Sequence, residues 1–181
     1  DYLLTGLFFS TERLGAYYFA FNLSTQTVQL VSTNLTSILL PSFAKLDREP
    51  ARQREAYLRV CSMITLVGVI LCIIQGLMAA PLLRLMFGHK WDEAIPLFQI
   101  LTVGMIFVIP SSPGVPLMVA QGKFRRVMIW TAVTAMSFIG SVTIGAASGS
   151  TLGIAVADVL FYAVFGPLGV VIPFEHACRT L

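Results

Sequence analysis

Long stretches without a charged residue limit what this chain can fold into. Four of them have 24 to 31 residues (14–44, 60–83, 94–122 and 127–157), and a fifth, 159–174, has 16. A transmembrane helix needs about 20 mostly apolar residues to cross about 30 Å of hydrocarbon. Only 12% of the 181 residues are charged and 56% are hydrophobic, whereas a soluble domain has about 25% charged residues. The sequence therefore predicts an integral membrane protein, and its composition excludes a disordered chain, a disulfide scaffold, a coiled coil and an ordinary soluble enzyme.

The fold class that this pattern predicts is all-α, a polytopic bundle of transmembrane helices in one lobe over residues 1–181. Five full spans are expected near 14–41, 60–80, 94–119, 128–147 and 152–173. The apolar segment 1–11 has about half the length of a span, so we expect a partial span and a fragment that begins inside a helix. Pro41 and Pro81 lie at span ends, where we expect them to terminate helices.

Basic residues gather on one side of this topology. If successive loops alternate between the two faces, one face carries nine Lys and Arg residues and the other carries three, Arg13, Arg84 and Lys90. Cytoplasmic loops have the excess of Lys and Arg, so the first face and the C-terminus are expected in the cytoplasm. The nine residues of that face are Lys45, Arg48, Arg52, Arg54, Arg59, Lys123, Arg125, Arg126 and Arg179.

The polar segment Leu46–Tyr57 separates the first two full spans. One interpretation is a short interfacial helix that brings Arg52, Arg54 and Arg59 to anionic lipid headgroups. The alternative is a solvated loop.

A regular set of polar residues runs along the first full span. Their spacings of four, three, four and three residues place them on one helical face, and lipid offers them no hydrogen bond. They either form interhelical hydrogen bonds or line a hydrated cavity through which a substrate passes, which is the interpretation we favour. The residues are Asn22, Gln26, Gln29, Thr33 and Thr36.

Asp158 lies six residues inside the last predicted span. A carboxylate within a membrane is costly and is a candidate functional residue, so we include it among the cavity candidates. The alternative is a hydrated residue near the end of the helix.

A proline cluster interrupts the third full span. Pro110, Pro113 and Pro116 each remove a backbone donor and crowd the preceding turn, and Gly114 lies among them. A broken helix of this kind is tolerated where neighbouring groups or water satisfy the freed carbonyl groups. These four residues are hinge candidates beside a cavity, or they form a static kink.

The sequence contains no pattern that indicates a cofactor, a metal site, catalysis or nucleic-acid binding. Cys61 and Cys72 lie eleven residues apart on one predicted helix, about 16 Å, which is too far for a disulfide. His89 and His176 fall on opposite faces, so they cannot share a metal ion. The net charge of +3 is explained by the loops of the basic face and does not indicate nucleic acid.

Four sequence elements resemble those of bacterial polysaccharide flippases of the O-antigen (Wzx) type. They occur in the family's order over about residues 1–126, and the rest of the chain resembles the family only as a hydrophobic helix pair. No element is specific alone, but the ordered set is. The elements are Asp1-Tyr-Leu-Leu-Thr-Gly6 with Leu14-Gly15-Ala-Tyr17, Pro41-Ser-Phe43-Ala44-Lys45-Leu46, Phe87-Gly88-His-Lys-Trp91 with Ala94-Ile95-Pro96, and Ala120-Gln-Gly122-Lys123.

The resemblance implies the fold of the multidrug/oligosaccharidyl-lipid/polysaccharide exporters, in which two six-helix lobes enclose a V-shaped cavity. This chain is then expected to be most of the C-terminal lobe, with the N-terminal lobe as its partner. The implied function is transport of undecaprenyl-diphosphate-linked oligosaccharide across the bacterial inner membrane by alternating access, without a cofactor and without enzymatic activity.

One feature departs from the family pattern. The family often has a basic residue after the glycine of the first element, whereas this chain has Leu7, and its five full spans contain no Lys or Arg. Cations that bind the diphosphate are therefore expected outside this chain. Two alternatives remain: another transporter of the superfamily (a lipid II flippase or a cation-coupled drug exporter), and a multi-span enzyme of polysaccharide assembly, against which the short outer loops argue.

Overall fold

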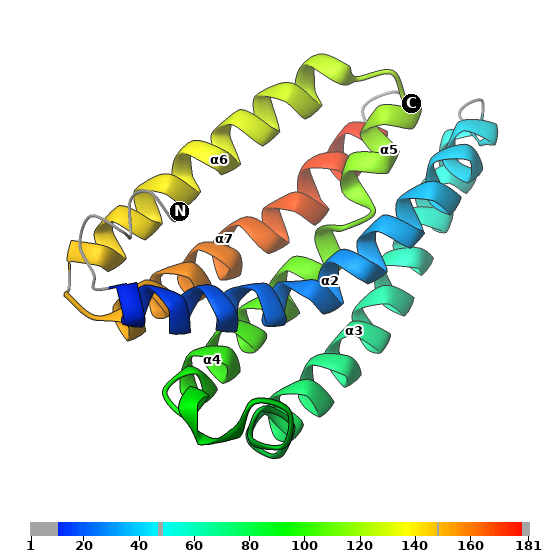
Figure 1. Ribbon diagram of the computed structural model, residues 1–181. Coiled ribbons are helices and arrows are strands. Elements are labelled where there is room, and N and C mark those ends of the chain that lie inside the picture. The colour runs from blue at the N-terminus through cyan, green and yellow to red at the C-terminus, as the bar shows by residue number, and fades with distance from the viewer. Residues whose placement is uncertain (1–10, 47–48, 148, 179–181) are drawn as a thin grey trace.

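A computed structural model describes residues 11–46, 49–147 and 149–178 as a bundle of helices (Figure 1). No strand occurs in this part of the chain. The expected partial span 1–11 lies outside the described residues except for Thr11. The helices are α2 (Thr11–Lys45), α3 (Pro50–Phe87), α4 (Ala94–Val108), α5 (Gly114–Ala120), α6 (Phe124–Ala147) and α7 (Thr151–Cys178), with the short 3-10 helices η1 (Gly88–Trp91) and η2 (Ile109–Ser111).

The all-α membrane fold is confirmed, but four rather than five helices are clearly long and apolar enough to cross a membrane. These are α3, the combined segment Ala94–Ala120, α6 and residues 151–173 of α7. Helix α2 has 35 residues, about 52 Å at 1.5 Å per residue, so it is long enough. Its many amide and hydroxyl side chains lower its mean hydropathy and distinguish it from the other four.

The expectation that two prolines end helices is wrong. Pro41 lies inside α2, which continues to Lys45, and Pro81 lies inside α3, which continues to Phe87. A proline removes one helical hydrogen bond, but ending the helix in a membrane would leave more backbone groups without partners.

Residues 50–57 form the first turns of α3. They are neither a separate interfacial helix nor a loop.

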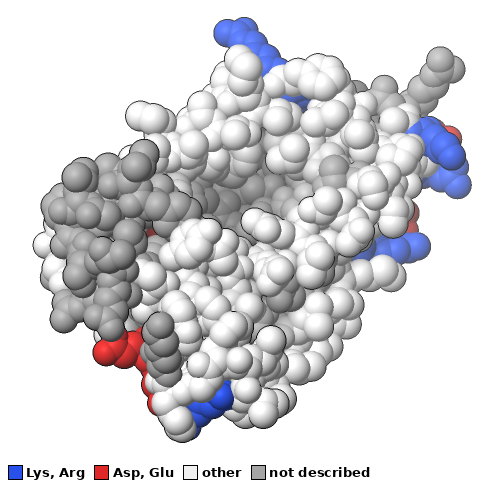
Figure 2. All heavy atoms as spheres, viewed as in Figure 1, with Lys and Arg blue, Asp and Glu red and all other residues white. Residues whose placement is uncertain are grey.

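Successive spans run in opposite directions between the two ends of the bundle, and α4 and α5 follow one another within a single span (Figure 1). The end of α2, the start of α3, the end of α5 and the start of α6 lie together; we call this the basic end. It carries seven of the nine residues assigned above to the cytoplasmic face, and the other two, Arg48 and Arg179, lie outside the described residues. Figure 2 shows that Lys and Arg gather there, whereas most of the described surface in this view is uncharged.

Helix α4 is the centre of the bundle, because α2, α3 and α7 all pack against it. Its residues Leu97, Phe98, Leu101 and Met105 are at most 3% exposed. Helix α6 packs against α7 and buries only Val142, Gly145 and Ala146. The outer face of α6 is therefore available to lipid.

Glycines allow the helices to approach closely at two contacts of the central segment. A Cβ atom on Gly166 of α7 would clash with the carbonyl group of Phe107, and a Cβ atom on Gly68 of α3 would lie 2.5 Å from Cγ2 of Ile109. In both cases the missing side chain makes room for the neighbouring helix. These contacts hold the end of α4 and the start of η2 between α3 and α7.

The turn between α5 and α6 uses a glycine for a different reason. Gly122 has φ of 66°, a left-handed conformation that glycine adopts at little cost. The N–H groups of Gly122 and Lys123 donate to the carbonyl groups of Val119 and Met118, both at 2.9 Å, as in a Schellman cap. This turn reverses the chain and brings α6 back along the bundle.

We predict that Gly166→Ala destabilises the protein by about 1–3 kcal/mol, because the added methyl group forces α4 and α7 apart. Thermal unfolding in detergent measures the effect. Gly140→Ala on α6 is the matched control, since nothing lies within 4 Å of the added Cβ atom and alanine favours a helix by up to about 1 kcal/mol. Equal melting temperatures for the Gly166→Ala variant and the unmodified protein would contradict the close packing.

Candidate functional site

Helix α2 has a buried face and, about half a turn away, an exposed polar face. The buried face includes Tyr17, Ala20, Ser24 and Val28, which are at most 8% exposed. The exposed face carries the polar residues whose regular spacing in the sequence predicted that they share one helical face. We call Asn22, Gln26, Gln29 and Thr33, all exposed, the polar row. The side chain of Thr36, the fifth predicted member, lies outside the described part of the structure.

Most members of the polar row have no hydrogen-bond partner within the described chain. Asn22 donates to the carbonyl group of Tyr18 at 2.9 Å, but no described group bonds to the side chains of Gln26, Gln29 or Thr33. Hydrocarbon cannot satisfy these groups. They therefore require water, a polar ligand or another polar segment.

Several polar residues of α2 outside the row are satisfied by their own helix. Thr25 donates to the carbonyl group of Phe21 at 2.9 Å, and Asn34 donates to that of Leu30 at 2.7 Å. Local bonds of this kind let polar side chains face lipid at low cost. Gln26, Gln29 and Thr33 differ from these residues because they make no described bond within their own helix. The polar composition of α2 alone therefore does not explain the polar row.

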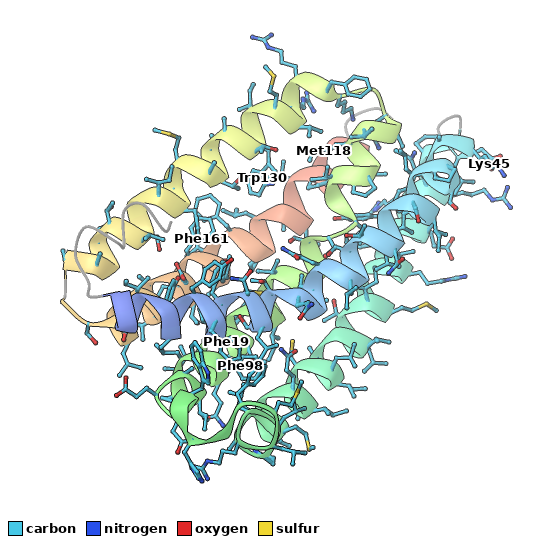
Figure 3. All side chains as sticks on the ribbon, viewed as in Figure 1. Phe19, Lys45, Phe98, Met118, Trp130 and Phe161 are labelled. Carbon is cyan, nitrogen blue, oxygen red and sulfur yellow. The ribbon has the colours of Figure 1, made fainter. Side chains whose placement is uncertain are left out.

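A mainly apolar cavity of about 230 Å³ adjoins the row between α2, α3 and α4. Gln26 lies at its edge together with Leu23 and Leu30, and Phe98 of α4 contributes to the opposite wall. Figure 3 shows Phe19 and Phe98 in the space between α2 and α4. Gln75 of α3 crosses this space and donates to the carbonyl group of Leu23 at 3.1 Å.

Asp158 lies in the core and is 0% exposed. The hydroxyl group of Tyr17 donates to its Oδ2 atom at 2.5 Å, whereas its Oδ1 atom has no described hydrogen-bond partner. Because Tyr17 belongs to the buried face of α2, Asp158 lies away from the polar row. The sequence did not indicate Tyr17 as its partner, since the two residues are separated by 141 positions.

The proline cluster breaks the helix where the sequence predicted. Helix α4 ends at Val108, η2 follows, and α5 starts at Gly114. The hydroxyl groups of Ser112 and Ser32 lie 2.9 Å apart, so the break touches α2. A Cβ atom on Gly114 would lie 2.6 Å from the carbonyl oxygen of Gly169 on α7. The break is thus closely packed between its neighbours, and its role as a hinge stays a prediction.

A hydrogen-bonded chain of side chains at the basic end was not predicted. Gln53, 2% exposed, donates to the carbonyl group of Phe43 at 2.9 Å and accepts from Gln121 at 2.8 Å. Lys123 donates to Gln121 at 2.7 Å. These bonds tie the α2–α3 connection to the α5–α6 turn. In the sequence Gln53 stands between two arginines, and such a polar context does not indicate burial.

The opposite end of the bundle has an exposed ion pair at the α3–α4 connection. Asp92 accepts a hydrogen bond from Arg84 at 3.0 Å and lies 3.2 Å from Nδ1 of His89. The hydrogen bond from Arg84 lowers the pKa of Asp92 below its ordinary value. Pairs as exposed as these contribute little to stability, so they serve mainly to order the turn.

Comparisons with known proteins identify relatives in polysaccharide biosynthesis. The chain is 27% identical to the teichuronic acid biosynthesis protein TuaB of Bacillus subtilis (strain 168), over 86% of the chain and 32% of that protein. It is 21% identical to the lipopolysaccharide biosynthesis protein WzxC of Escherichia coli (strain K12), over 77% and 28%. It is 24% identical to the succinoglycan biosynthesis transport protein ExoT of Rhizobium meliloti (strain 1021), over 75% and 28%.

The chain thus spans about a third of the length of these curated relatives. No solved structure matches it. The family model described as polysaccharide biosynthesis protein matches residues 1–96, more than half of the 181 residues. With its bundle of membrane-spanning helices, the chain belongs to the polysaccharide biosynthesis protein family.

Proposed function

We propose that the protein containing this chain is a flippase for a lipid-linked oligosaccharide in polysaccharide or lipopolysaccharide assembly. It moves the oligosaccharide, carried on undecaprenyl diphosphate, from the cytoplasmic to the outer leaflet of the bacterial inner membrane. Family membership supports a role in polysaccharide biosynthesis, and the name of one relative, a transport protein, favours transport over an enzymatic reaction.

The polar row of α2 is the observation that carries this proposal. Gln26, Gln29 and Thr33 are exposed and have no described partner, and Gln26 also borders the cavity between α2, α3 and α4. Sugar hydroxyl groups exchange hydrogen bonds readily with amide and hydroxyl side chains. A row of such groups along a membrane helix forms one wall of a hydrated path in which the sugars cross while the lipid chain stays in the bilayer.

The remaining wall belongs to a second lobe, and transport then follows alternating access. The broken span at Pro110, Pro113, Gly114 and Pro116 is the proposed hinge of this lobe. Cations that neutralise the diphosphate belong to the part of the protein outside this chain, because the apolar cores of the described spans contain no Lys or Arg.

The first prediction tests the polar row. Gln26→Leu together with Gln29→Leu should lower export of the polysaccharide by about tenfold or more, since each lost hydrogen bond to sugar or water costs about 1 kcal/mol. Cell-surface polysaccharide in a strain that depends on the variant measures export, and protein in the membrane fraction measures insertion.

A matched pair of substitutions controls for the loss of polarity. Thr33→Val on the row and Thr131→Val on the exposed face of α6 make the same chemical change in two places. Only the first should reduce export. Normal export by the double glutamine variant would refute the proposed path.

A second prediction tests the hinge. Ser32→Cys combined with Ser112→Cys places two thiols where the hydroxyl groups lie 2.9 Å apart, so oxidation should join α2 to the break and slow transport. Reduction should restore it, and the single Ser112→Cys variant should not respond to the oxidant. Equal rates before and after cross-linking would leave the segment a static kink.

A third prediction concerns Asp158, which we propose takes part in transport from the core. In Asp158→Asn the amide oxygen still accepts the hydrogen bond from Tyr17, so the fold should persist while transport falls by about tenfold or more. Tyr17→Phe, which removes the donor, should lower the melting temperature through the loss of a buried hydrogen bond. Unimpaired transport by the asparagine variant would assign Asp158 a structural role only.

A further inference from the structure

An open cleft of about 380 Å³ lies at the basic end, where α2 passes into α3. Arg52, Glu55, Ala56 and Arg59 of α3 line it, and Leu46 of the connection forms another wall. The four α3 residues recur at i, i+3, i+4 and i+7, so they lie on one helical face. The cleft therefore combines two guanidinium groups with an aliphatic surface.

The two arginines lie at the depth of lipid headgroups. Arg59 directly precedes the uncharged stretch 60–83, so it marks the boundary of the hydrocarbon. Arg52 lies two turns farther out, about 10 Å along the helix. A bilayer of about 40–45 Å with a hydrocarbon core of about 30 Å leaves roughly 5–8 Å for each headgroup layer, so the two arginines bracket that layer.

Both guanidinium groups keep donors for a ligand. Arg52 pairs with Glu49 at 2.8 Å and Arg59 with Glu55 at 2.9 Å, and all four side chains are more than half exposed. Each pair uses one nitrogen of a guanidinium group that has five N–H donors. Exposed pairs of this kind are weak, whereas arginine binds phosphate through two parallel hydrogen bonds.

The local charge is complementary to an anion. Between residues 45 and 59, the segment that contains the cleft, the described charged residues are Lys45, Arg52, Arg54 and Arg59 against Glu49 and Glu55, so basic groups are in excess. A phosphate held between Arg52 and Arg59 would lie beside Ala56 and Leu46, with its acyl chains directed past Arg59 toward the uncharged stretch 60–83.

We propose that this cleft binds an anionic phospholipid, such as phosphatidylglycerol, from the leaflet at the basic end. Its phosphate lies between Arg52 and Arg59, its glycerol backbone lies against Leu46 and Ala56, and its acyl chains pass Arg59 into the hydrocarbon. This inference does not depend on the proposed transport function, because it rests on charge, depth and shape alone.

The test measures lipid selectivity in the full-length protein. Spin-labelled phosphatidylglycerol and phosphatidylcholine, added to the protein in lipid nanodiscs, give a relative association constant from the immobilised fraction. The unmodified protein should prefer phosphatidylglycerol. Arg52→Gln with Arg59→Gln should reduce this preference by about fivefold for each arginine removed, and added salt should weaken it.

Two further variants separate the cleft from general surface charge. Arg54→Gln makes the same charge change two residues from Arg52, on another face of the helix and outside the cleft, so the preference should persist. Glu55→Gln removes the ion-pair partner of Arg59 and a negative charge that repels the lipid phosphate. The preference for phosphatidylglycerol should therefore rise. This gain keeps the proposal testable if the double arginine variant does not fold.

Several results would overturn the proposal. Equal binding of the two lipids by the unmodified protein would exclude a selective site. An equal loss in Arg54→Gln, or a decrease in Glu55→Gln, would show that the arginines act only through overall charge or helix stability. Displacement of phosphatidylglycerol by farnesyl diphosphate at equimolar concentration would assign the cleft to a polyprenyl diphosphate instead.

Discussion

Hydrocarbon offers no hydrogen-bond partner, and this constraint governs the whole structure. The backbone is satisfied by helices, which continue through Pro41 and Pro81 even though each proline costs a bond. Side chains such as Thr25 and Asn34 are satisfied by carbonyl groups of their own helix. Some side chains of the polar row make no such bond within the described part of their helix. These side chains therefore indicate contact with water or substrate.

The same constraint explains how a broken span can be accommodated. The segment around Pro110 is not supported by a regular helix, so it depends on close neighbours. Gly68 and Gly166 let α3 and α7 approach it, and Ser32 of α2 meets Ser112. A break held on three sides can change shape only together with the surrounding helices, which is consistent with a hinge that acts within a whole lobe.

The polar row and Asp158 have different surroundings. The polar row is exposed on one face of α2, whereas Asp158 of α7 is buried and pairs with Tyr17 on the opposite face of α2. The sequence predicted the row because its residues follow a helical period. It also marked Asp158, because a carboxylate is unusual in an apolar stretch, but it gave no reason to separate Asp158 from the row or to pair it with Tyr17.

The sequence by itself determined the class of protein, the polar face of α2, the position of the helix break and the basic end. All of these depend on composition or on spacing along one helix, and such patterns do not require a knowledge of neighbours. Only the tertiary structure decided which face of α2 is buried, that Asp158 lies in the core, that Gln53 joins two connections, and that Arg52 and Arg59 line a cleft with Leu46. These features depend on contacts between different helices and connections, and such contacts are set by packing, which no periodicity of a single helix encodes.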